Sequence, residues 1–515
     1  MPIFHHQLRS VGTSIIGISM GTAIALSFIQ PSIAENKPVS QPLQDTKKVA
    51  DSSKSTPSAK DVAQSTSPTL SPGNGNRFQQ TPLFNFIEPI SNPLQFPTKP
   101  SEVRIQQNEA ITLKEALELA RRHNRDLQVA AMQLERSRKV LREALAAEYP
   151  DLTLNANVTR SDNDATTSTL QPSNLSRSFG SSLELSYNLY TSGRRQAQVR
   201  AAERQVRSSE LELERISEQI RLDVTNTYYN LQNADEQVRI SQAAVNSAQQ
   251  SLRDTQNLEK AGVGTRFDTL RAQVQLANEV QNLTNARRDR QIAQRTLAER
   301  LSLAQSANLT AADPVQIAGI WDISLEQSIV MAYKNRAELE QQLVQKEIGE
   351  QNRRVAIGNL GPQINVFARY SVQDGLDDTI NPTNGYALGA RLNWNLYDGG
   401  ASRARAQQAE KDKEIAETRF ANLRNQVRLD VETAFFQLQS NFENIQTATV
   451  ALEQAKEALR LARLRFKAGV GTQTEVINAE TDLTTAEGRR VQAVLGYNRA
   501  LAALQRAITN LPINP

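Results

Sequence analysis

The sequence predicts a mixed, mostly α-helical protein in which very long helices of coiled-coil type alternate with two pairs of β-strands. Long stretches rich in Ala, Gln, Arg, Glu and Leu contain almost no Gly or Pro, which is typical of long helices. Short segments between them alternate apolar and polar residues with the period of a strand. The whole pattern then occurs a second time, which predicts a duplicated architecture.

The composition excludes several classes of function. Aromatic residues make up 5% and hydrophobic residues 39% of the 515 residues, too little for several ordinary globular cores. The 59 basic and 55 acidic residues leave a net charge of +4, and no basic stripe is interleaved with aromatics, so no nucleic-acid partner is expected. The absence of cysteine excludes disulfides and thiol chemistry.

The first residues indicate export. Arg9 precedes an apolar run that ends in small residues at Ala34, which predicts a secretory signal peptide over 1–34. The alternative is an uncleaved membrane anchor. Residues 35–110 are rich in Pro, Ser, Thr and Gln and predict a disordered extension.

The first structural repeat is expected over 111–303. Thr112 and Glu115 form a capping-box pattern, so a helix begins there and stops before Pro150. Alternating residues then predict strands over 151–160 and 181–190, followed by a long helix over 193–258 and a return helix over 266–303. At 1.5 Å per residue the long helix measures roughly 100 Å.

The long helix carries an apolar seam at heptad spacing, which predicts lengthwise packing on neighbouring helices. The seam consists of Val224, Leu231, Val238, Val245 and Leu252, with a second copy at Val431, Leu438, Ile445, Leu452 and Leu459.

A linker over 304–322 leads to the second repeat, 323–510. Its expected elements are a helix, strands over 363–372 and 385–396, a long helix over 400–465 and a return helix over 473–508. Gly193 recurs as Gly400 and Gly262 as Gly469, each 207 residues later (400 − 193 and 469 − 262). Coiled-coil resemblance alone does not explain matched strand pairs and an identical turn, so the repeat indicates duplication.

The strands have the length and alternation of membrane-spanning strands. About ten residues with one apolar and one polar face suffice to cross a bilayer around a wet lumen. A half-buried soluble sheet is the alternative, but the sequence offers little else for these strands to cover. Because four strands cannot close a barrel, several chains must share one.

The sequence shows no catalytic constellation, so we expect no enzyme, no metal and no cofactor. His123 is the only histidine beyond the predicted signal peptide. The turn glycines are not followed by the Lys-Ser or Lys-Thr of a phosphate-binding loop.

Three features of the sequence are duplicated: the capping boxes, the segments that leave the strands at 189–193 and 396–400, and the Gly-Val-Gly-Thr turns. Together they resemble the TolC family of outer-membrane efflux proteins, over Thr112 to about Ile508. The resemblance implies a homotrimer with a twelve-stranded transmembrane β-barrel, four strands per chain, continuous with a long periplasmic α-helical barrel. It implies a passive exit duct, gated at its periplasmic tip, in the outer membrane of a Gram-negative-type bacterium. The implied partners are outer-membrane lipid, a periplasmic adaptor and an inner-membrane pump or ABC transporter, in multidrug efflux or type I secretion.

The resemblance also implies site residues. The periplasmic entrance corresponds to Asp268, Arg271, Glu475 and Asn478, of which only Glu475 is acidic in the second repeat. The adaptor-contact hairpin tips correspond to Gly262, Val263, Gly264, Thr265, Gly469, Val470, Gly471 and Thr472. The family arginine that latches the closed state is replaced by Gly471. The alternative for Asp268 and Glu475 is that they are ordinary first-turn acids favoured by the helix dipole.

Two other functions fit parts of the sequence. A periplasmic coiled-coil adaptor should have one helical hairpin flanked by β-rich segments, whereas this sequence predicts two hairpins and two strand pairs. A purely structural coiled-coil protein leaves the strand pair that contains Trp394 unexplained.

Overall fold

The computed structural model describes residues 98–100, 107–163, 174–303, 307–376 and 381–509. The predicted signal peptide, 1–34, and most of the predicted extension, 35–110, lie outside the described residues. The helices are α1 (Leu113–His123), α2 (Arg125–Ala146), α3 (Arg194–Lys260), α4 (Arg266–Arg300), α5 (Leu325–Asn335), α6 (Ala337–Gly358), α7 (Ala401–Lys467) and α8 (Gln473–Ile508). The strands are β1 (Gln107–Ile111), β2 (Asp151–Asn163), β3 (Asn174–Tyr190), β4 (Ala307–Ala311), β5 (Gln363–Gly375) and β6 (Thr383–Asn393).

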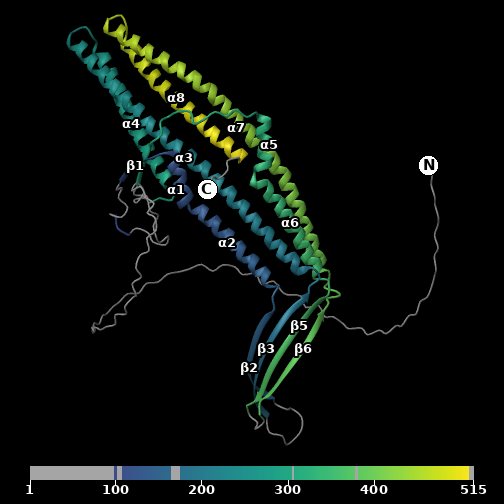
Figure 1. Ribbon diagram of the computed structural model, residues 1–515. Coiled ribbons are helices and arrows are strands. Elements are labelled where there is room, and N and C mark those ends of the chain that lie inside the picture. The colour runs from purple at the N-terminus through teal and green to yellow at the C-terminus, as the bar shows by residue number, and fades with distance from the viewer. Residues whose placement is uncertain (1–97, 101–106, 164–173, 304–306, 377–380, 510–515) are drawn as a thin grey trace, which may run out of the picture. The chain divides into compact units, whose positions relative to one another are not determined.

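The helices form two successive tiers along α3 and α7, which run through both (Figure 1). In the tier next to the strands, contacts give the order α2–α3–α6–α7. In the tier toward the hairpin turns, the order is α4–α3–α8–α7. In each tier, therefore, α7 forms one edge, and α2 or α4 forms the other.

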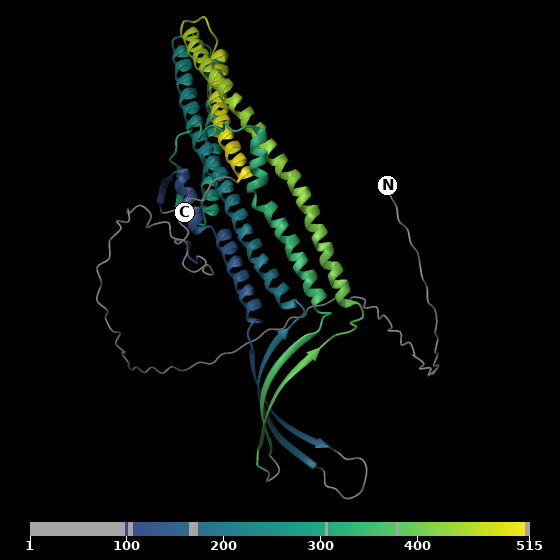
Figure 2. The same cartoon turned by 45° about the vertical axis from the view of Figure 1, so that its right-hand side comes forward.

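The strands β2, β3, β5 and β6 form one antiparallel sheet in that order. Both views show the sheet continuing from the ends of α2, α3, α6 and α7 (Figures 1 and 2). The two strand pairs are joined between β3 and β5, where Leu183 pairs with Tyr370. The sheet thus repeats the four-element order of the adjoining helical tier.

A hydrophobic core surrounds the small parallel sheet of β1 and β4, where the two tiers meet. Tyr228 of α3 is fully buried, and its hydroxyl donates to Asp313 Oδ2 at 2.7 Å. The same carboxylate oxygen accepts from the backbone N–H of Leu113 at 2.7 Å, which fixes the start of α1. A second core lies around Val431 of α7 and Leu504 of α8. These two cores hold the long helices together where their partners change.

The helix predicted from Thr112 to about Glu148 as one piece is in fact two helices. Asn124 has an extended backbone, ends α1 and caps α2 by accepting from Leu127 N–H at 3.1 Å. Its buried side chain also donates to the Arg300 carbonyl at 3.0 Å. Arg336 makes the equivalent break between α5 and α6. Tertiary hydrogen bonds at a polar residue therefore override the continuous helical pattern.

Several strand bounds also differ from the predicted ones. β2 and β3 extend beyond 151–160 and 181–190, because backbone pairing continues into polar residues up to Asn163 and Asn174. β6 spans 383–393 instead of 385–396, and Trp394 lies just beyond it, with its indole N–H donating to the Leu360 carbonyl at 3.0 Å. β1 lies partly in the predicted extension and β4 in the predicted linker, 304–322.

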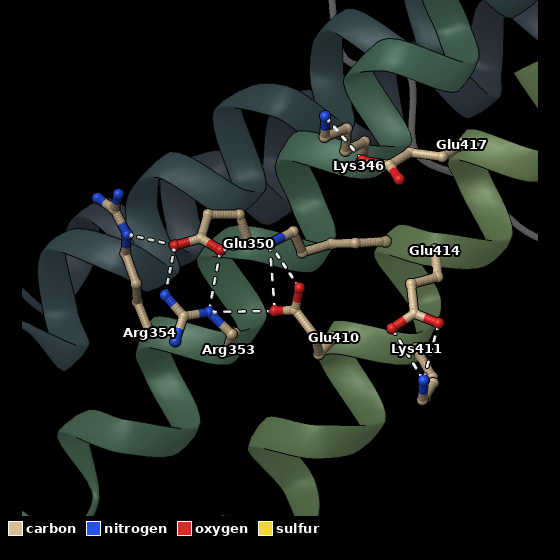
Figure 3. Close-up of polar contacts among 9 residues, drawn as sticks. Lys346, Glu350, Arg353, Arg354, Glu410, Lys411, Glu414 and Glu417 are labelled. Carbon is tan, nitrogen blue, oxygen red and sulfur yellow. Dashed lines mark hydrogen bonds and ion pairs between the residues drawn. The ribbon is translucent and has the colours of Figure 1, made fainter.

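An ion-pair network joins α6 to α7 near the sheet (Figure 3). The Glu350 carboxylate accepts from Arg353, Arg354 and Lys413 at 2.9–3.1 Å, and Lys413 also donates to Glu410 at 3.1 Å. A Cβ added at Gly349 would lie 2.9 Å from Lys413 Cγ, so the lysine stem lies directly across α6 at that glycine. The network stabilises the contact between α6 and α7, which no turn joins within this tier.

Candidate functional site

Both hairpins end in the same tight turn. After α3, the N–H groups of Gly262 and Val263 donate to the carbonyls of Glu259 and Leu258, both at 3.0 Å. This pattern is a Schellman motif, and it needs a left-handed residue, which Gly262 supplies with φ +77°. Gly469 does the same after α7 with φ +75°. With these caps the long helices end at Lys260 and Lys467, slightly beyond the predicted helix ends at residues 258 and 465.

The second glycine of each turn is required for a different reason. A Cβ on Gly264 would lie 2.8 Å from Leu258 Cβ, and one on Gly471 would lie 2.9 Å from Arg465 Cβ. Both positions are therefore in close contact with the last turn of the preceding helix. The valines between the glycines point outward, with Val263 76% and Val470 69% exposed. Each tip thus presents one apolar side chain to its surroundings.

The predicted entrance residues lie in the first turns of the return helices, but they have different partners. Thr265 caps α4 by accepting from Asp268 N–H at 3.2 Å, and Thr472 caps α8 by accepting from Glu475 N–H at 3.3 Å. The Asp268 carboxylate accepts the Thr265 hydroxyl, and Glu475 Oε2 lies 3.5 Å from Arg465 Nε. Each acid therefore binds within its own hairpin.

Arg271 is the entrance residue that connects the two hairpins. Its guanidinium donates to Thr474 Oγ1 at 2.7 Å, from α4 to the start of α8. Asn478 is exposed, and no hydrogen bond joins it to another entrance residue among the described positions. The structure therefore links one predicted entrance residue across the hairpins.

Further polar contacts between the hairpins were not predicted. Glu480 is buried on α8 and accepts from Ser247 Oγ at 2.8 Å and from Arg463 Nη2 at 2.9 Å. Gln473 donates to Ser251 Oγ at 2.7 Å. Ser247 and Ser251 are four residues apart on α3 and therefore share a face. This spacing is the only sign of the contact in the sequence. Nothing in the sequence pairs that face with α8.

The sheet has one polar and one apolar face, as the alternation predicts. Paired positions place their side chains on the same face. The polar face includes Asn155, Ser182, Glu184, Asn188, Asn365, Arg369 and Arg391. The apolar face includes Leu152, Leu154, Leu183, Leu185, Tyr370, Tyr386, Leu388 and Leu392, all of them exposed. Such a surface needs an apolar environment to cover it.

Neither a membrane-spanning helix nor a metal-binding cluster occurs among the described residues. None of the helices there combines the length and apolarity needed to cross a membrane. Within the same ranges, no group of three His, Asp or Glu residues could hold a metal ion.

Comparisons with known proteins agree with this architecture. A family model described as Outer membrane efflux protein matches residues 116–302 and 328–510, more than half of the chain. The pyoverdine export outer membrane protein OpmQ of Pseudomonas aeruginosa is 26% identical over 360 residues, covering 68% of this chain and 71% of the relative. Among solved structures, VceC of Vibrio cholerae has a TM-score of 0.65 at 20% identity, over 77% of this chain and 95% of that chain. The CmeC channel of Campylobacter jejuni has a TM-score of 0.68 at 17% identity, over 82% of this chain and 94% of that chain. The match confirms the resemblance carried by the repeats and turns, and the chain belongs to the outer membrane efflux protein family.

Proposed function

We propose that the chain is one subunit of a homotrimeric exit duct in the outer membrane. The duct passes solutes or polypeptides delivered by an inner-membrane pump or ABC transporter through a periplasmic adaptor, in efflux or type I secretion. It is a passive conduit and lowers no chemical barrier. We propose that three chains together form a twelve-stranded barrel, continuous with a barrel of helices in the periplasm.

The proposal rests on the two edges of the described fold, which differ from each other in the sheet and in both helical tiers. In the sheet, β2 and β6 each have one side without a strand partner among the described residues. Open strand edges are not tolerated in lipid, so another copy must pair with them. Because the two edges differ, the pairing of copies is head-to-tail, which generates a ring when the rotation between copies closes.

The edge helices support the same arrangement with exposed apolar residues. On α7 these residues lie seven or fourteen residues apart, on the side opposite the buried seam, and Glu443 and Glu457 occupy the intervening heptad positions. The α7 set is Leu429, Phe436, Val450 and Leu464, and the opposite edge has Val129, Met132 and Val140 on α2 and Phe267, Leu270 and Val274 on α4. We propose that α7 of one copy packs on α2 and α4 of the next.

The strand lengths support the membrane assignment. β2 has 13 residues and β6 has 11, against the 9–11 that a tilted strand needs to span a bilayer. The exposed apolar face would contact lipid and the polar face would line the lumen.

We further propose that the hairpin tips are the periplasmic entrance and the docking point for the adaptor. Val263 and Val470, with the turn residues around them, would be the adaptor contacts. Asp268, Arg271, Glu475 and Asn478 would line the entrance. The hydrogen bond from Arg271 to Thr474 supports a closed state, because it holds the two hairpins of one subunit together.

Conductance of the purified trimer in a planar bilayer tests the duct. We expect discrete conductance steps from a particle whose native mass corresponds to three chains. A particle of that mass that never conducts, even with the entrance acids replaced, would contradict the proposal.

The entrance assignment has its own test in Glu475→Ala. Loss of the carboxylate should raise conductance or weaken block by multivalent cations, because such ions bind rings of acidic groups. Glu487→Ala, deeper on the same helix, should change neither property. If Glu475→Ala changed neither conductance nor cation block, Glu475 would be only a first-turn acid that stabilises the start of α8.

A further inference from the structure

One large apolar side chain breaks the polar face of the sheet. Phe367 on β5 pairs with Ser186 on one side and Gly389 on the other. A Cβ added at Gly389 would lie 2.8 Å from Phe367 Cζ and 3.0 Å from Cε1. The far end of the ring therefore reaches over the glycine on β6. No other described position on this face combines an aromatic ring with a facing glycine.

The ring holds a cation beside it. Arg391 follows Gly389 by two residues and so points to the same face. Its guanidinium carbon lies 5.3 Å from the centroid of the Phe367 ring, within the roughly 6 Å range of a cation–π contact. The guanidinium donates no hydrogen bond to another described residue, so its N–H groups stay free to donate to a bidentate acceptor.

Two of the other charges on this face, Arg369 and Glu184, compensate each other. Arg369 donates to Glu184 Oε2 through Nε at 2.6 Å, so these two residues neutralise each other. Asp151 accepts from the Thr153 hydroxyl at 3.0 Å but has no ion-pair partner among the described residues, and within one chain it lies on β2, the strand farthest from β6. Across the residues that the structure describes, no carboxylate forms an ion pair with Arg391. Arg391, near the end of the edge strand β6, is therefore the one positive charge on the polar face without an ion-pair partner among the described residues.

We propose that Arg391, held by Phe367, makes the lumen of the strand barrel selective for anions. The inference rests on the proposed function, because it takes the polar face as the lumen wall of a trimer. Three copies would place three guanidinium groups in one ring of the lumen. The favoured solutes are those that carry a carboxylate, phosphate or sulfonate group, which match the geometry of a guanidinium edge.

The reversal potential of the trimer in a planar bilayer with a KCl gradient is the test. Arg391→Gln should lower the chloride-to-potassium permeability ratio by roughly threefold or more, because a channel wall of low dielectric constant concentrates counter-ions around fixed charge. Arg391→Lys keeps the charge and should preserve most of the ratio. The double variant Arg369→Gln with Glu184→Gln removes a neutral pair from the same face and should leave the ratio unchanged.

The outcomes separate this inference from the duct itself. Channels that conduct normally but show no change in permeability ratio with Arg391→Gln would overturn the inference and leave the duct proposal intact. Such a result would mean that a carboxylate of an adjoining copy neutralises Arg391. An equal drop in the double variant would also overturn it, since the effect would then not be specific to the unpaired cation. Absence of conductance in the unaltered protein would contradict the duct.

Discussion

At the scale of single residues, the second glycine of each hairpin turn sets how tightly the tip can fold. We expect Gly471→Ala to loosen the turn after α7, because its Cβ would meet the Arg465 side chain and backbone at 2.9–3.0 Å. Overpacking of this kind costs about 1–3 kcal/mol. Hydrogen exchange should show faster exchange of the Val470 and Gly471 amides, which now donate to the Arg465 carbonyl.

Gly385→Ala is the matched control, because nothing lies within 4 Å of the added Cβ. It should leave exchange at the tip unchanged. Unaltered tip exchange in Gly471→Ala would show that the turn adjusts freely and that Gly471 is not required for its geometry.

Single residues also show where sequence reasoning succeeds. The Thr112 capping box is confirmed, with reciprocal bonds between Thr112 and Glu115, because it depends only on residues three apart. The turn glycines are confirmed for the same reason. The bond from Arg271 to Thr474 joins residues 203 apart, and the sequence does not reveal which helix faces meet. Local chemistry was predictable at the site, and pairing across hairpins was not.

At the scale of elements, the network around Glu350 makes the contact between α6 and α7 dependent on pH. The hydrogen bond from Arg353 lowers the pKa of Glu350 to about 2, aided by Lys413 and Arg354 and opposed by burial. A carboxylate with a lowered folded-state pKa stabilises the fold above its unfolded pKa, here 4.5, and loses that contribution as pH falls toward 2.

We therefore expect Glu350→Gln to lower the thermal unfolding midpoint at pH 6 and to have a smaller effect at pH 3. Thermal unfolding of the detergent-solubilised protein at both pH values measures this. Glu326→Gln, at an exposed position in the first turn of α5, should change the midpoint little at either pH. If Glu350→Gln lowered the unfolding midpoint by the same amount at pH 3 and pH 6, the carboxylate charge would not be the source of the stabilisation.

The elements themselves were largely predictable, because heptad and period-two patterns are local. Val224 and Leu231 of the predicted seam are buried, whereas Val238 is half-buried, since the face that α3 buries depends on which partner it meets in each tier. The short strands β1 and β4 were not predicted as a sheet. They pair across 200 residues of sequence; β1 has no alternating pattern, and the alternation of β4 covers only five residues.

At the scale of the whole molecule, the exposed seam of α7 is where assembly can be tested. We expect Phe436→Glu to weaken the proposed trimer, because it places a charge among apolar residues that another copy would bury. Phe436 is 56% exposed in the single chain, so the substitution has little to disturb within the subunit. Native mass spectrometry of the detergent-solubilised protein should show a larger share of single chains.

The neighbouring residue offers a control. Gln437→Glu adds the same charge about a quarter turn round the helix, away from both seams. It should leave the trimer intact. A trimer that survives Phe436→Glu unchanged would indicate that copies meet through another surface.

The unlike edges of the sheet have one further consequence. A head-to-tail contact does not by itself limit the number of copies, because each added chain presents a fresh β6 edge to the next β2 edge. What ends the series is the angle through which each chain turns relative to its neighbour. A substitution that changed the twist between β3 and β5 would leave every pairwise contact possible and yet prevent closure, and the product would be an open polymer instead of a pore.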